Sequence, residues 1–286
     1  MRLGLFFISH VQSFATKYAR SEPEDVENLS ESQKQTIINS FGVNCVQEKW
    51  DFLIKLLPDL IREKILQVFL ESLIFQEIFR RFFMNPWWYM DGKMHPSDKG
   101  DDKFVCIPQL SAQRYVLLTT LIAIANPLMA GLWRSETNRL ANATHFQQAP
   151  KIELGTYHRD RRHEPIKWLL KETSSEEEIE TRYAQLHELY KMAVECAAEM
   201  GNIRGNISLQ SLAVLPQTFN ASAGDRVLAH EYHCLRNNSP KLDDRRILFF
   251  VYPGIVRRHI SALERHNIEY SIPAYVVVSS PGEKAP

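Results

Sequence analysis

Apolar residues recur at helical spacing through much of the chain, and one long stretch dominates the pattern. Over residues 59–84 apolar side chains return every three to four positions, and Asn85-Pro86 follows directly. The apolar arc is too broad for a helix with one solvated face, so the pattern predicts a long, central and mostly buried helix. Proline and the residue before it disfavour helical continuation, which predicts the end of the helix here.

A second apolar stretch carries no charge. Nineteen residues from Tyr115 to Trp133 lie between Arg114 and Arg134 without an acidic or basic side chain. A transmembrane helix needs about 20 predominantly apolar residues, whereas Asn126-Pro127 divides this stretch into pieces too short to span. We therefore expect a kinked helix in the core and no transmembrane span.

The clearest amphipathic helix is predicted over residues 172–199. Thr173, Ser174 or Ser175 can cap its start, and Gly201-Asn202 is a typical end. Eight acidic and only two basic residues fall in this span, so the exposed face is expected to be strongly acidic. The predicted buried stripe consists of Ile179, Tyr183, Leu186, Leu189, Tyr190, Ala193 and Ala197.

The hydrophobic pattern changes near the C-terminus. Residues 247–252 and 274–278 form two continuous β-prone runs, the first of which ends at Pro253-Gly254. These runs predict a small ribbon or two-stranded sheet beside the helices. The whole pattern therefore predicts a mainly α protein, with a single helical-bundle-like domain over residues 45–280, a small C-terminal β element and a short tail over 281–286.

Residues 1–44 precede the predicted domain. Their first part has no acidic residue before Glu22, and its apolar residues recur at helical spacing. Three interpretations stay open: a helix that packs on the domain, a mitochondrial presequence, or a signal peptide. Residues 21–40 are polar and acidic, which predicts a flexible linker. The apolar positions of the first part are Leu3, Phe6, Phe7, Val11, Phe14 and Tyr18.

Charge and composition then narrow the function classes. The chain of 286 residues has 34 basic and 34 acidic side chains, and 44% of its residues are hydrophobic. Such a balance predicts a soluble globular protein without the net field that attracts nucleic acid. Four scattered cysteines are too few for a disulfide scaffold, so we expect an intracellular protein, cytoplasmic or, as the alternative, mitochondrial.

The best candidate for a metal site is the segment from His230 to Cys234. If this segment is helical, His230 and His233 lie on one face, where Cys234 or the nearby Asp243 and Asp244 could join them. The spacing is not that of the HExxH motif, and a closed zinc site needs four ligands. Hydrogen-bonded or solvated histidines are therefore the alternative to a weak metal site, and no cofactor is expected.

Two further groups of residues are candidate partner-binding sites. Trp87, Trp88 and Tyr89 concentrate aromatic surface at the end of the first predicted helix, as an aromatic lid, a partner-binding anchor, a ligand wall or simply core. The basic tract 158–163 could bind a partner, through a phosphate or nucleic-acid contact, or pair with the acidic helix of the same chain, which is the favoured interpretation. Its arginines are Arg159, Arg161 and Arg162.

Two segments resemble a known group of proteins. ILQVFLESLIFQEIFRRFFMNPWWYMD, from Ile65 to Asp91, and the later ILFFVYPGIVRR with AYVVVSS are similar to parts of uncharacterised, predominantly helical proteins of filamentous fungi. The likeness covers about residues 46–280 and consists of apolar patterns. It implies a single helical domain and carries no site residues.

Nucleotide-binding, hydrolase-elbow and kinase motifs do not occur in the sequence. The first functional hypothesis is therefore a non-enzymatic interaction or regulatory protein, whose oligomeric state the sequence leaves open. The alternatives are a ligand-binding protein or metal-dependent enzyme with a pocket near Trp87, Trp88, His230 and His233, and peripheral membrane association through the N-terminal segment.

Overall fold

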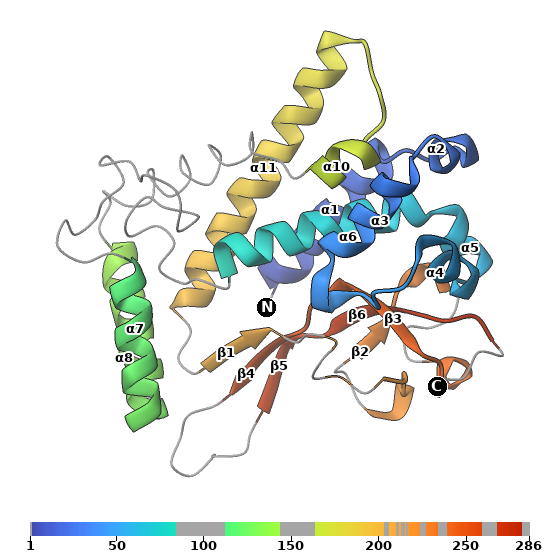
Figure 1. The fold of residues 1–286 in the computed structure, drawn as a ribbon. Helices are drawn as coiled ribbons and strands as arrows, with labels where there is room; N and C mark the ends of the chain where they lie inside the picture. Colours follow the sequence, from blue (N-terminus) through green and yellow to red (C-terminus); the bar gives the residue numbers. More distant parts are fainter. Residues whose placement is uncertain are drawn as a thin grey trace.

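The computed structural model describes most of the chain and shows a mainly helical protein with two small sheets (Figure 1). The described residues are 2–83, 112–143, 164–202, 206–209, 212, 215, 217–223, 227–233, 239–258 and 268–281. The candidate residues Trp87, Trp88, Tyr89, Arg159, Arg161 and Arg162 lie outside them.

Helix α6 (Ile65–Ile78) is the centre of the core, as its broad apolar arc predicts. Every residue of α6 except Gln76 is buried, and the helix packs on α1 (Arg2–Tyr18), on α10 (Glu164–Leu169) and on strand β3 (Ile247–Tyr252). The predicted helix over 59–84 is interrupted at Lys64, whose φ of −105° and ψ of 16° separate the short α5 (Asp59–Glu63) from α6. A π-helical segment, Phe79–Phe83, continues α6.

The strands form two three-stranded sheets on one side of the central helix. Strand β6 (Ala274–Val278) pairs antiparallel with β3 (Ile247–Tyr252) and parallel with β2 (Val227–Ala229). In the second sheet, β4 (Ile255–Arg258) lies between β1 (Asn206–Leu209) and β5 (Ile268–Ile272), and all its pairs are antiparallel. The two β-prone runs do pair, but the β element is larger than the expected ribbon.

The N-terminal residues are part of the fold. Helix α1 (Arg2–Tyr18) contacts α6 and α11 (Glu176–Gly201), and its Phe7, Val11 and Phe14 are buried in the main core. This is the arrangement that the first of the three N-terminal interpretations predicts.

The flexible linker expected over residues 21–40 is wrong, because α2 (Pro23–Glu27) and α3 (Glu31–Ser40) occupy it. Ser30 and Gln33 form a capping box at the start of α3, and Ile37 and Ile38 are fully buried. The polar composition of this segment reflects a helix with one narrow apolar side. Other short helices among the described residues are the 3₁₀ turns Gly42–Asn44, Ala221–Ala223, Glu231–His233 and Pro240–Leu242, and α4 (Trp50–Leu56).

The uncharged stretch forms two helices rather than one kinked core helix. Helix α7 (Ala112–Ala125) ends before Asn126, and α8 (Pro127–Ala143) starts at the proline. Helix α8 contacts both α7 and α11, and the pair stands at the edge of the molecule (Figure 1). The expectation of a buried helix is wrong for α7, because most of its described side chains face solvent. Among the described helices, none has the length and apolarity to cross a membrane.

Candidate functional site

A buried polar cluster lies where α1, α6 and the segment 230–233 meet. Glu71 on α6 and His230 are each 1% exposed, and His230 Nε2 lies 3.7 Å from Glu71 Oε2. Burial raises the pKa of the Glu71 carboxyl, and the neighbouring His230 and Gln12 partly oppose this effect. The cluster is therefore an acid–base pair held away from water inside an apolar core.

The backbone fixes which nitrogen of His230 faces the carboxyl. The backbone N–H of Tyr232 donates to His230 Nδ1 at 3.4 Å, so a neutral imidazole carries its proton on Nε2. Nε2 is the atom that points to Glu71, and within the described structure it has no closer hydrogen-bond acceptor. The arrangement can hold one proton between an imidazole and a carboxyl.

Gln67 extends this cluster to α1. Its Nε2 donates to Thr16 Oγ1 at 2.8 Å and to the Tyr232 hydroxyl at 2.5 Å. Gln67 and Glu71 are one helical turn apart, so both project from the same side of α6. Burial raises the pKa of Tyr232, which keeps its hydroxyl protonated. The cluster thus joins the first helix, the central helix and the segment after β2 by polar contacts.

His233 is oriented differently from His230. The backbone N–H of Val278 donates to His233 Nε2 at 3.2 Å, and the ring is buried. Burial, followed by the positive charges of His230 and Arg245, lowers the pKa of His233 to about 3. His233 is therefore neutral at physiological pH and acts as a hydrogen-bond acceptor for strand β6.

The metal hypothesis for His230 and His233 stays a prediction. One nitrogen of each ring already accepts a backbone hydrogen bond, which occupies a lone pair that a metal would need. In the described part of the chain, no three His, Cys, Asp or Glu side chains come together as metal ligands would. Cys234 lies outside the described residues.

The titration of His233 has a measurable consequence for stability. Between its ordinary pKa of 6.5 and the folded value of about 3, the unfolded chain binds a proton that the folded protein does not. The free energy of unfolding should therefore fall by about 2 kcal/mol from this group as the pH falls from 7 to 5. The variant His233→Gln keeps an acceptor for Val278 but does not titrate, so its stability should fall less over the same range.

Urea unfolding of the wild type and His233→Gln at pH 7, 6 and 5 measures this difference. The raised pKa of Glu71 acts in the opposite direction, because it favours proton binding by the folded state, and it is present in both proteins. Equal pH slopes for the two proteins would show that His233 is not held neutral by the fold.

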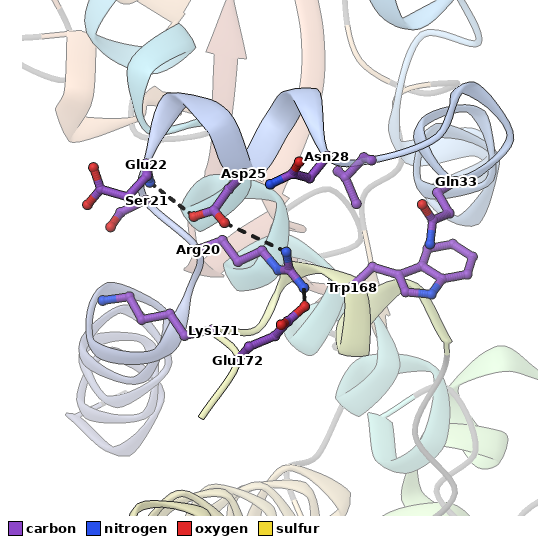
Figure 2. Close-up of a pocket in the computed structure, with 10 residues that line it drawn as sticks. Arg20, Ser21, Glu22, Asp25, Asn28, Gln33, Trp168, Lys171 and Glu172 are labelled. Carbon is purple, nitrogen blue, oxygen red and sulfur yellow. Dashed lines mark hydrogen bonds and ion pairs between the residues drawn. The ribbon is translucent and has the colours of Figure 1, made fainter. Parts of the chain in front are cut away.

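A surface pocket lies between α2, α3 and the end of α10. Figure 2 shows Arg20 at its centre, with Asp25 and Glu172 beside the guanidinium and Trp168 on another wall. The pocket has a volume of about 580 Å³. Arg20 Nη2 lies 2.7 Å from Glu172 Oε1, Nη1 lies 3.7 Å from Asp25 Oδ1, and Nε donates to the Leu170 carbonyl at 3.1 Å. Its charge is thus neutralised within the chain, so the pocket is not arranged to bind an anion.

The most unusual surface is the apolar side of α7. Four large apolar side chains of α7 are 45–78% exposed: Leu117, Leu118, Leu121 and Ile124. We call these four side chains the α7 stripe. Positions 117, 121 and 124 follow the spacing of one helical face, and 118 flanks them. Met129, at the start of α8, is 51% exposed close to the same end of the hairpin. The stripe can form an apolar contact with a second body.

Some of the candidate residues predicted from the sequence lie in these sites, and others lie outside the described residues. His230 and His233 belong to the buried cluster, whereas Glu71 and Gln67 were missed, although two polar residues one turn apart in an apolar helix are a readable signal. The aromatic and arginine candidates lie outside the described residues. Comparisons with protein-family models, curated proteins and solved structures find no match.

Proposed function

We propose that this protein is a non-enzymatic interaction protein whose contact surface is the α7 stripe. The observation that carries the proposal is the distribution of exposed large apolar side chains. Seven occur in the described residues, and five of them lie on α7 and the first turn of α8. Scattered exposed apolar residues are normal, whereas a contiguous patch marks an interaction surface.

The support of α7 by the rest of the fold suits this role. Helix α8 contacts both α7 and α11, and its Ala130, Ser135 and Asn138 are buried. The side chain of Asn138 lies against Gly201, where an added Cβ would meet it at 3.1 Å. This close packing connects α8 to α11, so α8 links α7 to the rest of the fold.

Site-specific photo-cross-linking in living cells tests the proposal. A photoreactive benzoylphenylalanine replaces Leu121 in the stripe, and a matched control replaces the exposed Glu180 of α11. We expect position 121 to give adducts with a second molecule, and position 180 to give none. Loss of these adducts on adding Leu117→Gln would link them to the stripe.

The stability of the purified Leu117→Gln variant shows whether that variant is folded. Because Leu117 is 59% exposed, Leu117→Gln should change the free energy of unfolding by no more than about 0.5 kcal/mol. Adducts at position 121 that join only residues of the same chain would contradict the proposal. The similarity to helical proteins of filamentous fungi stays a prediction beside it.

A further inference from the structure

We infer that the body contacted by the α7 stripe is a lipid bilayer, into which the α7–α8 hairpin dips from one side. This inference rests on the proposed function, because it names the partner of the same surface. Three features of the hairpin favour a lipid partner: the distribution of charge along it, the depth of its uncharged zone and the hydrogen bonds of its turn.

The charge pattern of α7 distinguishes lipid from protein partners. Leu117, Leu118, Thr120, Leu121, Ile124 and Ala125 are all exposed, so water meets the helix over much of its circumference. A solvated helix normally carries charged residues on its exposed face, and a protein interface is bordered by a polar rim. Helix α7 has no charge after Arg114, which is the condition for contact with hydrocarbon.

The depth of the uncharged zone matches one leaflet. Counted from Asn126 at the turn, the first charged residue is twelve positions back on α7, at Arg114, and eight positions ahead on α8, at Arg134. At about 1.5 Å per residue these positions lie roughly 18 Å and 12 Å from the turn. Half of the hydrocarbon core of a bilayer is about 15 Å. Charged residues thus begin near the level of the head groups.

Several polar groups of the turn are hydrogen-bonded within the chain. The Asn126 N–H donates to the Ile122 carbonyl at 2.6 Å, and the Asn126 carbonyl accepts from the Ala130 N–H at 3.1 Å. The Met129 N–H donates to Asn126 Oδ1 at 3.2 Å, and Pro127 has no N–H to satisfy. Backbone groups that enter hydrocarbon must be paired within the protein, and these groups of the turn are.

The N-terminal segment is not available for the same purpose. Its apolar residues Phe7, Val11 and Phe14 are 3%, 0% and 4% exposed because α1 packs on α6 and α11. Membrane contact through this segment would require α1 to leave the core. The hairpin needs no such rearrangement, since its apolar side already faces outward.

Co-sedimentation of the full chain with lipid vesicles tests the inference. The vesicles contain phosphatidylcholine alone or phosphatidylcholine with 30% phosphatidylserine, and the protein is the wild type or Leu121→Lys/Ile124→Lys. We expect the wild type to bind both kinds of vesicle, and the double variant to bind at least about tenfold more weakly, because a lysine side chain is strongly disfavoured in hydrocarbon. A matched control, Thr181→Lys/Gln185→Lys, adds the same charge at exposed positions of α11 and should bind the phosphatidylcholine vesicles as the wild type does, and the anionic vesicles at least as strongly.

The control variant separates apolar insertion from attraction of charge. Added lysines strengthen binding to anionic vesicles by electrostatics, so weaker binding of the stripe variant cannot come from its charge. Circular dichroism and thermal unfolding confirm that each variant is folded, and Leu121→Gln/Ile124→Gln replaces the lysine pair if that pair does not fold. Equal binding of wild type and stripe variant, or no binding by the wild type, would overturn the inference.

The binding and cross-linking experiments distinguish a protein partner of the α7 stripe from the failure of both proposals. If sedimentation equilibrium shows a dimer that Leu121→Lys/Ile124→Lys dissociates, and vesicles bind neither protein, the stripe joins two copies and the lipid inference is wrong while the proposed function holds. The same conclusion follows if position 121 cross-links to protein but not to lipid. If position 121 forms no intermolecular adduct at all, the proposed function itself fails.

Discussion

Phe69→Ala is expected to lower the free energy of unfolding by about 3–5 kcal/mol, the range for a fully buried phenylalanine whose cavity cannot close. Phe69 is 0% exposed in the middle of α6. Its ring centroid lies 5.0 Å from that of Phe41, 5.6 Å from that of Trp50 and 5.3 Å from that of Phe249. These partners come from the end of α3, from α4 and from β3, so the substitution weakens three contacts between distant segments at once.

Urea unfolding followed by far-ultraviolet circular dichroism measures this loss. Phe52→Ala provides the matched control, because Phe52 lies on α4 and is 49% exposed, and its loss should cost no more than about 0.5 kcal/mol. A loss below 1 kcal/mol for Phe69→Ala would mean that the aromatic cluster does not hold the helices to the sheet.

The elements that could be predicted from the sequence are those in which nearly every residue is buried. Helix α6 has apolar residues on all sides, and β3 is a run of six buried residues, so each pattern indicates its environment without knowledge of its neighbours. The strands β1, β2, β4 and β5 were missed because they are short, and β1 and β2 also pair with strands far away in the chain.

The errors at α3 and α7 have one physical cause. A helix needs only a narrow buried side, and the two buried isoleucines of α3 supply it within an otherwise polar segment. Conversely, an apolar helix is buried only if the rest of the chain covers it, and the described residues leave α7 uncovered. The hydrophobic pattern of a segment indicates which residues prefer an apolar contact. Tertiary packing determines whether the protein itself provides that contact.

The buried cluster shows the same limit at the level of chemistry. Two histidines three positions apart suggested that both could bind one metal ion, yet His230 faces Glu71 and His233 faces the backbone of Val278. Glu71 lies on a helix that precedes His230 by more than 150 residues, so only the fold brings the two together. A carboxyl inside an apolar helix is itself informative, because an unpaired one would cost several kcal/mol.

His230→Leu is the second change with a large expected effect, a loss of about 3–5 kcal/mol in the free energy of unfolding at pH 7. The substitution leaves Glu71 buried without its imidazole partner, and it removes the acceptor of the Tyr232 N–H. Without His230, the pKa of the Glu71 carboxyl should rise further above its ordinary value. The folded variant should therefore bind a proton at Glu71 more strongly than the folded wild type does. Stability of this variant should therefore increase as the pH is lowered from 7 toward 5, relative to that of the wild type.

A double-mutant cycle separates the pair from its surroundings. Glu71→Leu/His230→Leu places two apolar side chains in an apolar core, and it should be less destabilising than the sum of the two single changes by about 1–3 kcal/mol. The control cycle combines His230→Leu with Leu242→Ala, because Leu242 belongs to the separate cluster around Phe219 and Phe250, and these two changes should add within about 0.5 kcal/mol. Additive losses in the first cycle would mean that Glu71 and His230 are neighbours without being partners. Coupling there, with additivity in the control, would show that the contact between Glu71 and His230 contributes to holding α6 and the segment after β2 together.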